Sequence, residues 1–487
     1  MANLDVMALA IAVPIKVERP LCVDLDGTLV KSDTLADSLM VLARRHPAAL
    51  LRVPLWAMKG RAHLKSRATG MAALDVAHLP YNRPLLDYLR EEYAAGRSLI
   101  LATGADGVLA RRIADHLGIF DDVMASDGEV NLTGKSKLQY LDERFPDEGF
   151  DYIGNALPDV PLLQGAKQAM LANPHLGLIR ALKNRNITVS RGFQDRSCLP
   201  VALAKALRVH QWAKNLLVFV PLLLGHSFGS LSFLAAIAAF FCFSLTASAT
   251  YILNDLLDLE PDRVHLNKRK RAFAAGDLSV TTGITISFLM TATALSTAVY
   301  LPRGFLIYLL LYLATTIAYS LAFKRIVLVD VVVLSSLYTI RMLAGAAATQ
   351  TPISPWLAAF STFLFLSLAM VKRFSELRNL SARGMNPSNG RGYLLSDVEQ
   401  LRSFGTSSAY ASVVVFALYI SGNGVVELYH HAQRLWLTTP MMILWLSRVW
   451  LLASRGLLDE DPVVFALTDR TSLLLGVGVL LVALSAV

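Results

Sequence analysis

The sequence predicts two parts: an α/β domain built on a parallel sheet, followed by an all-α domain of about nine membrane-spanning helices. Composition is the first reason, because a chain of 487 residues with 54 % hydrophobic and 17 % charged residues is too long for one ordinary core and too apolar for a wholly soluble protein. Distribution is the second. Residues 1–205 mix charged and apolar residues as a globular domain does, whereas 214–487 consists of long apolar runs.

Most of the apolar segments in the second part are long enough to cross a hydrocarbon core about 30 Å thick. They lie near 214–228, 232–253, 280–301, 304–322, 327–349, 354–371, 404–421, 435–453 and 470–487. Basic residues gather in the loops after the second, fourth and sixth segments, while the opposite loops hold little beyond Arg303 and Arg434. The positive-inside rule therefore predicts a multi-pass protein of the inner membrane with its amino-terminal domain in the cytoplasm.

The formal charge of +9 does not indicate nucleic-acid binding, because the basic residues from 254 onward cluster in loops between apolar runs. We expect the lipid bilayer as a partner and no nucleic acid; a homo-oligomer stays open. Three widely spaced cysteines form no metal or disulfide pattern, which favours a reducing compartment for the first part. Residues 1–18 lack a basic region before their apolar stretch, so we interpret them as a leader rather than a cleaved secretory signal.

In the first part, apolar runs alternate with segments long enough for helices, which is the pattern of a parallel α/β sheet. The runs lie at 20–25, 98–102, 121–125, 150–154 and 168–172. The first two are so far apart that we expect a helical cap at about 33–90, and we interpret 176–207 as a linker. The active site is expected at the carboxyl ends of the strands.

A basic stretch with aromatic and apolar interruptions lies inside the predicted cap. It contains Trp56, Lys59, Arg61, Lys65 and Arg67. Two interpretations stay open: a solvated cap surface, or contact with anionic lipid headgroups.

The second apolar segment ends in an acidic motif, NDxxDxxxD. It comprises Asn254, Asp255, Asp258 and Asp262 and is followed by the basic run 268–271. Spacings of three and four residues place the carboxylates on one side of a helical turn, where their oxygens can bind Mg²⁺ and, through it, a diphosphate. A solvated helix end is the simpler interpretation, but so many charges are costly near lipid without a function.

This motif, the nine segments and the basic tail KRKRAFAAG resemble the UbiA superfamily over about 208–487, whose members ionise a diphosphate substrate at such sites and join it to an acceptor. The sequence is most similar to the decaprenyl-phosphate phosphoribosyltransferase group, which moves phosphoribose from phosphoribosyl diphosphate onto a polyprenyl phosphate. The similarity lies in RVHQWAKN at 208–215, in Tyr319-Ser320 with the residues that follow, in Arg341 with Gly345, and in KRFSEL at 372–377. The loop after the sixth segment lacks the second DxxxD that aromatic prenyltransferases of the superfamily usually carry.

The resemblance implies roles for individual residues. Asp255 and Asp258 would be catalytic, and Asn254, Asp255, Asp258 and Asp262 would bind Mg²⁺. Substrate phosphates would be bound by a larger, mostly cationic set: Lys214, Lys268, Arg271, Lys324, Arg325, Asp330, Arg341, Lys372, Arg373 and Glu376. Arg341 lies deep in the fifth segment, so we expect it to pair with Asp330, Glu376 or a bound phosphate.

The first strand ends in DxDGT, and the order of later motifs resembles the HAD superfamily over about 19–175. Asp24 would attack phosphorus, and Asp26 would protonate the leaving oxygen and later activate water. The remaining matches are Thr103, Lys137 or Lys135, Asn155 and Asp159, with Asp24, Asp26, Asn155 and Asp159 as Mg²⁺ ligands. Asn155 stands where the family usually has aspartate, which lowers the charge available to the metal and leaves an active phosphatase or a non-catalytic scaffold open.

Joining the parts suggests a hypothesis: the membrane domain makes polyprenyl-phosphoryl-ribose 5-phosphate, and the HAD-like domain removes the 5-phosphate. The alternative is a prenyltransferase that uses a polyprenyl diphosphate and an aromatic or lipid acceptor, with a non-catalytic HAD-like domain. A lipid-binding or transport protein with degenerate sites is a third interpretation, against which the intact acidic motif argues.

Overall fold

The computed structural model describes residues 19–487 apart from 227–228, 383, 385–390 and 459–460, so the predicted leader lies outside the described residues. The chain divides into two compact units. The first unit combines the chain up to Leu203 with Asp255–Thr282, and the second combines Ala204–Asn254 with Gly283–Val487. The loop that follows the second apolar segment therefore belongs to the first unit.

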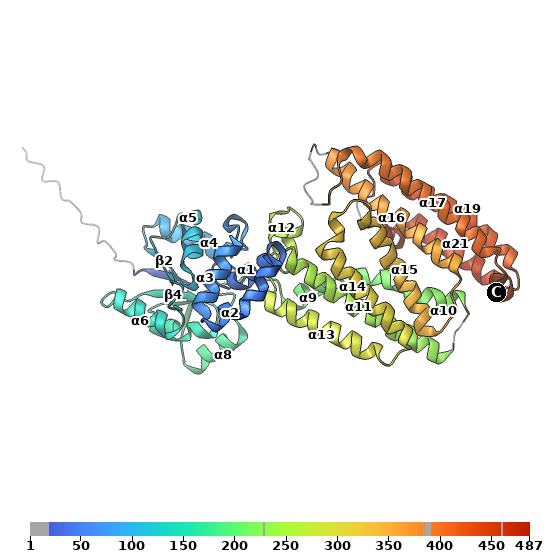
Figure 1. Cartoon of the computed structure of the whole chain (residues 1–487). Coiled ribbons are helices and arrows are strands. Elements are labelled where there is room, and N and C mark those ends of the chain that lie inside the picture. Colours follow the sequence, from blue (N-terminus) through green and yellow to red (C-terminus); the bar gives the residue numbers. More distant parts are fainter. Residues whose placement is uncertain (1–18, 227–228, 383, 385–390, 459–460) are drawn as a thin grey trace, which may run out of the picture. The chain divides into compact units, whose positions relative to one another are not determined.

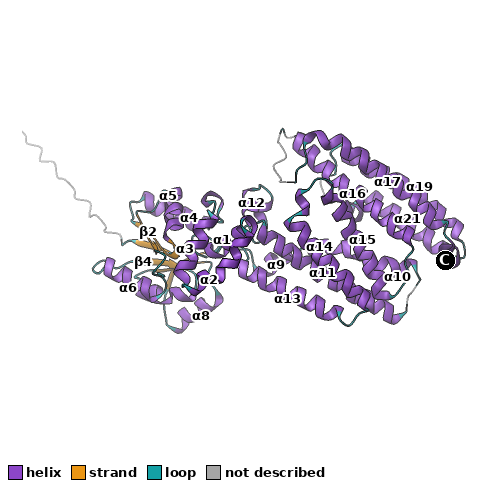
Figure 2. Cartoon of the chain, in the orientation of Figure 1, coloured by secondary structure: helices purple, strands orange, loops and turns teal. Residues whose placement is uncertain are grey.

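The first unit is built on a six-stranded parallel sheet with the order β3-β2-β1-β4-β5-β6, drawn in orange in Figure 2. The strands are β1 (Leu21–Val23), β2 (Leu99–Asp106), β3 (Asp122–Ser126), β4 (Asp151–Gly154), β5 (Ala169–Ala172) and β6 (Val189–Phe193). Successive side chains of β1 enter different cores, Leu21 and Val23 one and Cys22 the other, so both faces are covered. Strand order reverses at β1, which places a site at its carboxyl end.

Helices cover this sheet and form the predicted cap (Figure 1). Between β1 and β2 the structure has α1 (Thr34–Arg45), α2 (Val53–Met58), α3 (Arg61–Ala72) and α4 (Arg83–Ala94), with 3₁₀ turns at Pro47–Arg52 and Val76–His78. The later helices are α5 (Gly107–Leu117), α6 (Lys135–Arg144), α7 (Val160–Gly165), α8 (Leu176–Asn184) and α9 (Leu199–Leu207). Asp33 and Asn82 cap α1 and α4 by accepting backbone N–H bonds, which explains where these two helices begin.

The range 176–207 is not the linker that the sequence predicts. It contains α8, the sixth strand β6 and α9, and β6 pairs with β5 along its length. Four of the five β6 residues are exposed, and they include Ser190 and Arg191. An edge strand pairs with a neighbouring strand along one edge only, so more of its residues are exposed and it lacks an apolar run.

The second unit is all helical. Its helices are α10 (Val220–Leu224), α11 (Ser230–Leu257), α13 (Val280–Ala298), α14 (Arg303–Leu321), α15 (Val329–Thr349), α16 (Pro355–Ala382), α17 (Val398–Ile420), α18 (Asn423–Leu428), α19 (Thr438–Ser454), α20 (Pro462–Thr468) and α21 (Arg470–Ala486). The short helix α12 (Leu259–Val264) follows α11 in the first unit.

Within the described residues, seven helices are long and apolar enough to span a membrane, or eight if α20 and α21, bent by 79°, form one span. The first predicted segment is shorter than a span: it is a 3₁₀ helix at Val209–Phe219 continued by α10. Large apolar side chains such as Leu231, Phe288 and Leu474 are more than two-thirds exposed, as bilayer-facing residues are. The chain is a multi-pass membrane protein.

Candidate active sites

Asp24 follows β1 directly and meets a lysine from α6. Lys137 Nζ lies 2.7 Å from Asp24 Oδ1 and also donates to the carbonyl of Ala102 on β2 and to the hydroxyl of Tyr152 on β4. The lysine is 3 % exposed. One buried ammonium thus contacts β2, β4 and the residue that follows β1, and it offsets the charge of the carboxylate predicted to attack phosphorus.

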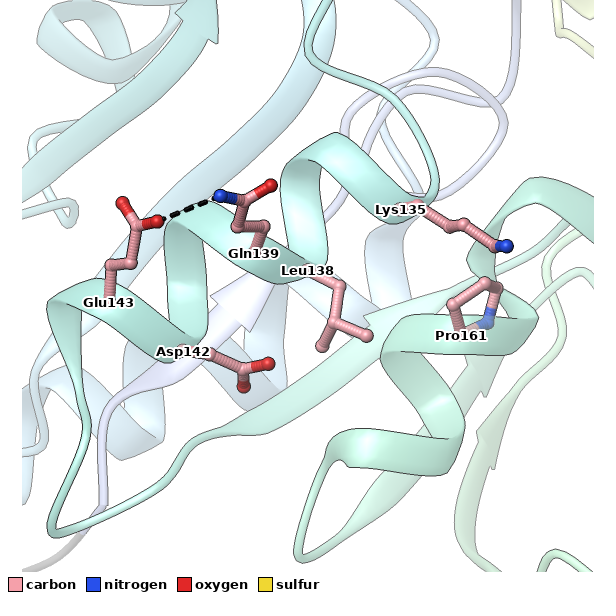
Figure 3. Close-up of a pocket in the computed structure, with 6 residues that line it drawn as sticks. All are labelled: Lys135, Leu138, Gln139, Asp142, Glu143 and Pro161. Atoms are coloured by element: carbon pink, nitrogen blue, oxygen red, sulfur yellow. Dashed lines mark hydrogen bonds between the residues drawn. The ribbon is translucent and has the colours of Figure 1, made fainter.

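The structure places the two lysines that the sequence left open in different surroundings. Lys135 begins α6 and lines a surface pocket with Gln139, Asp142 and Glu143 (Figure 3). Lys137 lies two residues further along the helix and contacts Asp24. A step of two residues turns a helix by more than half a revolution, so only one of the two lysines can reach the site.

Burial raises the pKa of both Asp24 and Asp26. Burial raises the pKa of Asp24 to about 6, while Lys137 opposes the rise. Burial, with a smaller effect of the nearby Asp33 carboxylate, raises the pKa of Asp26 to about 7, although Asp26 Oδ1 accepts a hydrogen bond from Thr34 N at 2.8 Å. Both carboxyls therefore hold a proton more readily than an exposed aspartate does, which suits Asp26 as an acid, and Lys137 favours the ionised form of Asp24 that a nucleophile needs.

The other predicted residues of this site lie at the neighbouring strand ends. Thr103 is fully buried on β2, and its hydroxyl accepts from Ala105 N. Asp159 holds the loop after β4, because one carboxylate oxygen accepts from the amides of Asn155 and Ala156 and the other from Tyr152. Asn155 packs against Gly27, whose added Cβ would lie 2.1 Å from Asn155 Nδ2. Glycine with φ +77° is needed at this turn.

These residues fit a Mg²⁺ ion modestly. Asp24 and Asn155 present oxygen donors at adjacent strand ends, while both oxygens of Asp159 are engaged in hydrogen bonds. Among the described residues, no three His, Cys, Asp or Glu side chains come close enough to hold a metal ion. Mg²⁺ often binds through one or two protein oxygens and keeps its waters or substrate oxygens, so the set suffices chemically.

Lys65 was not predicted to lie at the site. It comes from cap helix α3, and its Nζ donates to the carbonyl of Gly104, next to Thr103, and to Asn131 Oδ1. Its pKa is lowered by burial, and the carboxylate of Asp26 opposes that change. Arg61 and Arg67 of the same basic stretch are exposed. In the sequence, helical phase separates Lys65 from Arg67, two residues on, but not from Arg61, which lies four residues earlier on the same face.

We expect Lys65→Met to raise the KM for a phosphomonoester by roughly tenfold, because the variant loses a charge-assisted donor beside the site. Steady-state hydrolysis of p-nitrophenyl phosphate measures it, with Arg67→Met as a control that removes an exposed cation from the same helix. An unchanged KM in Lys65→Met would show that the lysine only closes the cap.

The acidic motif is not one continuous helical turn. Helix α11 ends at Leu257, Asp258 caps α12 with φ −94° and ψ 16°, and α12 begins at Leu259. Pro261 explains the break, because it has no N–H to donate to the carbonyl four residues earlier. We call 255–264 the acidic segment.

Two of its carboxylates converge on one cation. Arg271 Nη1 lies 3.1 Å from Asp255 Oδ1 and 2.6 Å from Asp262 Oδ2, and both aspartates are at most 4 % exposed. Burial raises the pKa of Asp262, and Arg271 opposes it. Because these carboxylates can share a cation, they fit a Mg²⁺ ion that takes its remaining ligands from a diphosphate and water. Asp258 instead faces Arg44 at 3.4 Å, and Lys268 lies in the turn that leads to Arg271.

In the second unit, Asn254 and Lys324 lie close together. Lys324 Nζ lies 3.4 Å from Asn254 Oδ1, which brings the turn after α14 to the end of α11. Arg325, the next residue, is exposed.

Arg341 does not pair with Asp330 or Glu376. Its guanidinium, 4 % exposed, donates to Asn215 Oδ1, to the carbonyl of Leu337 and to the hydroxyl of Tyr312, and it lies over the rings of Tyr312 and Tyr338. Among the described residues no carboxylate lies within ion-pair distance of it. Dipoles and ring faces solvate its charge instead.

Asp330 pairs with Arg373. Arg373 Nε lies 2.5 Å from Asp330 Oδ2, and its Nη1 lies 2.7 Å from Glu376. Tyr393 donates to the other Asp330 oxygen. Arg373 and Asp330 are at most 2 % exposed, so this pair joins α15 to α16 inside the unit.

Lys214 and Lys372 share a carboxylate that the sequence did not single out. Asp461, at the start of α20, lies 2.7 Å from Lys214 Nζ and 3.0 Å from Lys372 Nζ. Lys214 also lies over the ring of Tyr338, on which Arg341 packs as well. Three cations therefore gather around one carboxylate and one aromatic ring, which leaves a positive excess within a mostly apolar helical unit. We call Lys214, Arg341 and Lys372 the cationic cluster.

Comparison with known proteins agrees with the helical unit. Residues 215–468, about half of the chain, match the model of the UbiA prenyltransferase family. The chain belongs to this family. The protein y4nM of Sinorhizobium fredii is 40 % identical over 460 residues, which cover 94 % of this chain and 89 % of that protein, so the similarity extends over both units.

Decaprenyl-phosphate phosphoribosyltransferase of Mycobacterium tuberculosis is 34 % identical to this UbiA family member over 231 residues, 46 % of this chain and 76 % of that protein. For the first unit, a HAD family hydrolase of Salmonella enterica superposes with a TM-score of 0.28 at 13 % identity, covering 36 % of this chain and 66 % of that one. The protein is an enzyme of the transferase class.

Proposed function

We propose that the protein transfers 5-phosphoribose from phosphoribosyl diphosphate to a polyprenyl phosphate, and that its HAD-like domain then removes the 5-phosphate. The reaction would take place at the cytoplasmic face of the inner membrane, where the basic loops predict that the HAD-like domain lies. Similarity to decaprenyl-phosphate phosphoribosyltransferases supports the choice of substrates.

The observation that carries the proposal is the cationic cluster. Its three cations have one carboxylate, Asp461, among them, and Arg341 is held by neutral groups. Lys214 and Arg341 are buried, and such an excess of positive charge favours an anionic ligand. An acceptor with a phosphate head and a donor with a 5-phosphate supply such charge, whereas a hydroxybenzoate acceptor supplies less.

The residues suggest a division of labour. Asn254, Asp255, Asp258 and Asp262 would hold Mg²⁺, which would supply positive charge to the departing diphosphate. Lys324 beside Asn254 would bind the same diphosphate, and Lys268, Arg271 and Arg325 would balance its outer charge. The cationic cluster would orient the acceptor phosphate. That oxygen is already anionic at neutral pH, so positioning and electrostatics can carry the step without a strong general base.

The second step would be hydrolysis of a phosphomonoester. Asp24 attacks phosphorus to give an aspartyl-phosphate while Asp26 protonates the ribose oxygen that leaves, and Asp26 then takes a proton from the water that releases phosphate. Lys137 offsets the charge of Asp24 and of the transferred group.

A membrane assay tests the transfer. Phosphoribosyl diphosphate labelled in the ribose is incubated with Mg²⁺, polyprenyl phosphate and membranes that contain the protein, and label is followed into the organic phase. We expect Mg²⁺-dependent lipid labelling that EDTA abolishes, because the acidic segment alone repels a diphosphate. Labelling from an isoprenyl diphosphate but not from phosphoribosyl diphosphate would contradict the proposal and favour a prenyltransferase.

A further inference from the structure

An arginine of the acidic segment is buried in the HAD-like domain. Arg263 of α12 reaches Asp37 of cap helix α1, with 2.8 Å between Nη2 and Asp37 Oδ2, and the same nitrogen donates to the hydroxyl of Ser32. Ser32 in turn donates to Asp37 Oδ2 at 2.6 Å. Asp37 is fully buried and Arg263 is 7 % exposed. All of these residues belong to the first unit.

Further contacts surround this pair. Arg44 and Arg45 of α1 lie 3.4 Å from Asp258 and 2.5 Å from Glu260, but these pairs are partly exposed. Beyond the acidic segment, a Cβ added to Gly276 would lie 2.7 Å from Lys31 Cβ, so the backbone packs closely there. The acidic segment and the loop that follows it, as far as Gly276, therefore contact the HAD-like domain at several neighbouring points.

Of these ion pairs, the buried pair Arg263–Asp37 contributes most to fixing the position of the acidic segment. Exposed ion pairs contribute little, because water and salt screen them. Removing one member of a buried pair leaves an uncompensated charge and is strongly destabilising, whereas neutralising both members is often tolerated. Arg263 follows Asp262 directly, so the ion pair that fixes Arg263 on Asp37 also fixes the position of the Asp262 carboxylate.

Ser32 connects the same contact to the phosphatase-like site. Its carbonyl accepts from Gly27 N in the turn after Asp24, and Thr34, two residues on, donates to Asp26. Both ends of the loop 27–34 therefore lie beside Asp26, and Ser32 within the loop contacts Arg263.

We propose that Asp37 and Ser32 of the HAD-like domain are positioning residues for the transferase: by fixing Arg263 they hold the acidic segment in the conformation that binds Mg²⁺ and diphosphate. The domain then serves the transferase as a scaffold, whatever its own hydrolytic activity. Naming diphosphate as the ligand rests on the proposed function; the seating of the segment does not.

Limited proteolysis of the full chain in lipid nanodiscs tests the seating. Trypsin cleavage at the exposed Arg269 and Lys270, just after the acidic segment, is followed by mass spectrometry. We expect Asp37→Asn and Arg263→Met each to accelerate this cleavage at least tenfold, and the double variant to return close to the parent rate, because it leaves no unpaired charge. The exposed pair Asp87–Arg90 gives a matched control, Asp87→Asn with Arg90→Met, that leaves cleavage unchanged.

The same cleavage, repeated with Mg²⁺ and inorganic diphosphate, tests the positioning. We expect the ligands to protect the loop, and the half-protecting diphosphate concentration to rise about tenfold in each single variant and to recover in the double variant. Equal cleavage in parent and single variants, or an unchanged protecting concentration, would overturn the inference. Protection in a parent that transfers no phosphoribose would instead contradict the proposed function and leave the scaffold role supported.

Discussion

Replacing Asp255 by asparagine is expected to lower the rate of phosphoribosyl transfer about a thousandfold, because the variant removes the charge that would hold Mg²⁺ and keeps the shape of the side chain. Asp255 is 4 % exposed and converges with Asp262 on one guanidinium nitrogen of Arg271. Loss of its charge leaves Arg271 with one carboxylate. The initial rate of lipid labelling, measured at several Mg²⁺ concentrations, gives the effect.

The matched control is Glu399→Gln, which neutralises an exposed carboxylate that pairs with Arg402. Its labelling rate should stay within about twofold of the parent, since exposed pairs contribute little. Transfer by Asp255→Asn at a rate close to the parent would show that the acidic motif is not the diphosphate site. It would also favour the interpretation as a binding or transport protein, for which these carboxylates have no catalytic use.

Features encoded within a few residues could be predicted from the sequence. The turn after β1 carries Asp24 and Asp26 in one motif, and the strand that precedes it is fully buried, so hydrophobicity and motif agree. The UbiA membership could be predicted for the same reason, since the acidic motif and its basic tail are contiguous. The match of residues 215–468 to the family model confirms it. The spacing of the carboxylates by itself predicts a continuous helix, although Pro261 in the sequence marks the break.

Features that depend on distant partners could not be predicted. Asp461 lies 247 positions from Lys214, and nothing near it marks it as the carboxylate that two lysines share. Arg341 was expected to need a carboxylate, but amide, carbonyl and phenol groups from three helical segments hold it. The residues of edge strand β6 predict a linker, because Ser190, Arg191 and Gly192 separate its two apolar residues. In each case the partner, rather than the residue, decides the role.

Exchange of Asp24 for asparagine is expected to stop hydrolysis of the 5-phosphate and to let the phosphorylated lipid accumulate. The amide oxygen can still accept from Lys137, which lies 2.7 Å from Asp24 Oδ1, so the fold of the site is retained. An amide does not form the aspartyl-phosphate, and loss of a nucleophile lowers kcat at least about a thousandfold. Thin-layer chromatography of the labelled lipids separates the phosphorylated product from its dephosphorylated form.

The rate at which total label enters lipid should not change in this variant, because the transferase step precedes hydrolysis and uses other residues. Asp115→Asn, an exposed aspartate on α5, is the control and should give the parent lipid profile. A profile in Asp24→Asn identical to that of the parent would show that the HAD-like domain does not act on this lipid. The lower charge that Asn155 gives the metal site would then be the first explanation to test, because restoring an aspartate at position 155 should strengthen Mg²⁺ binding.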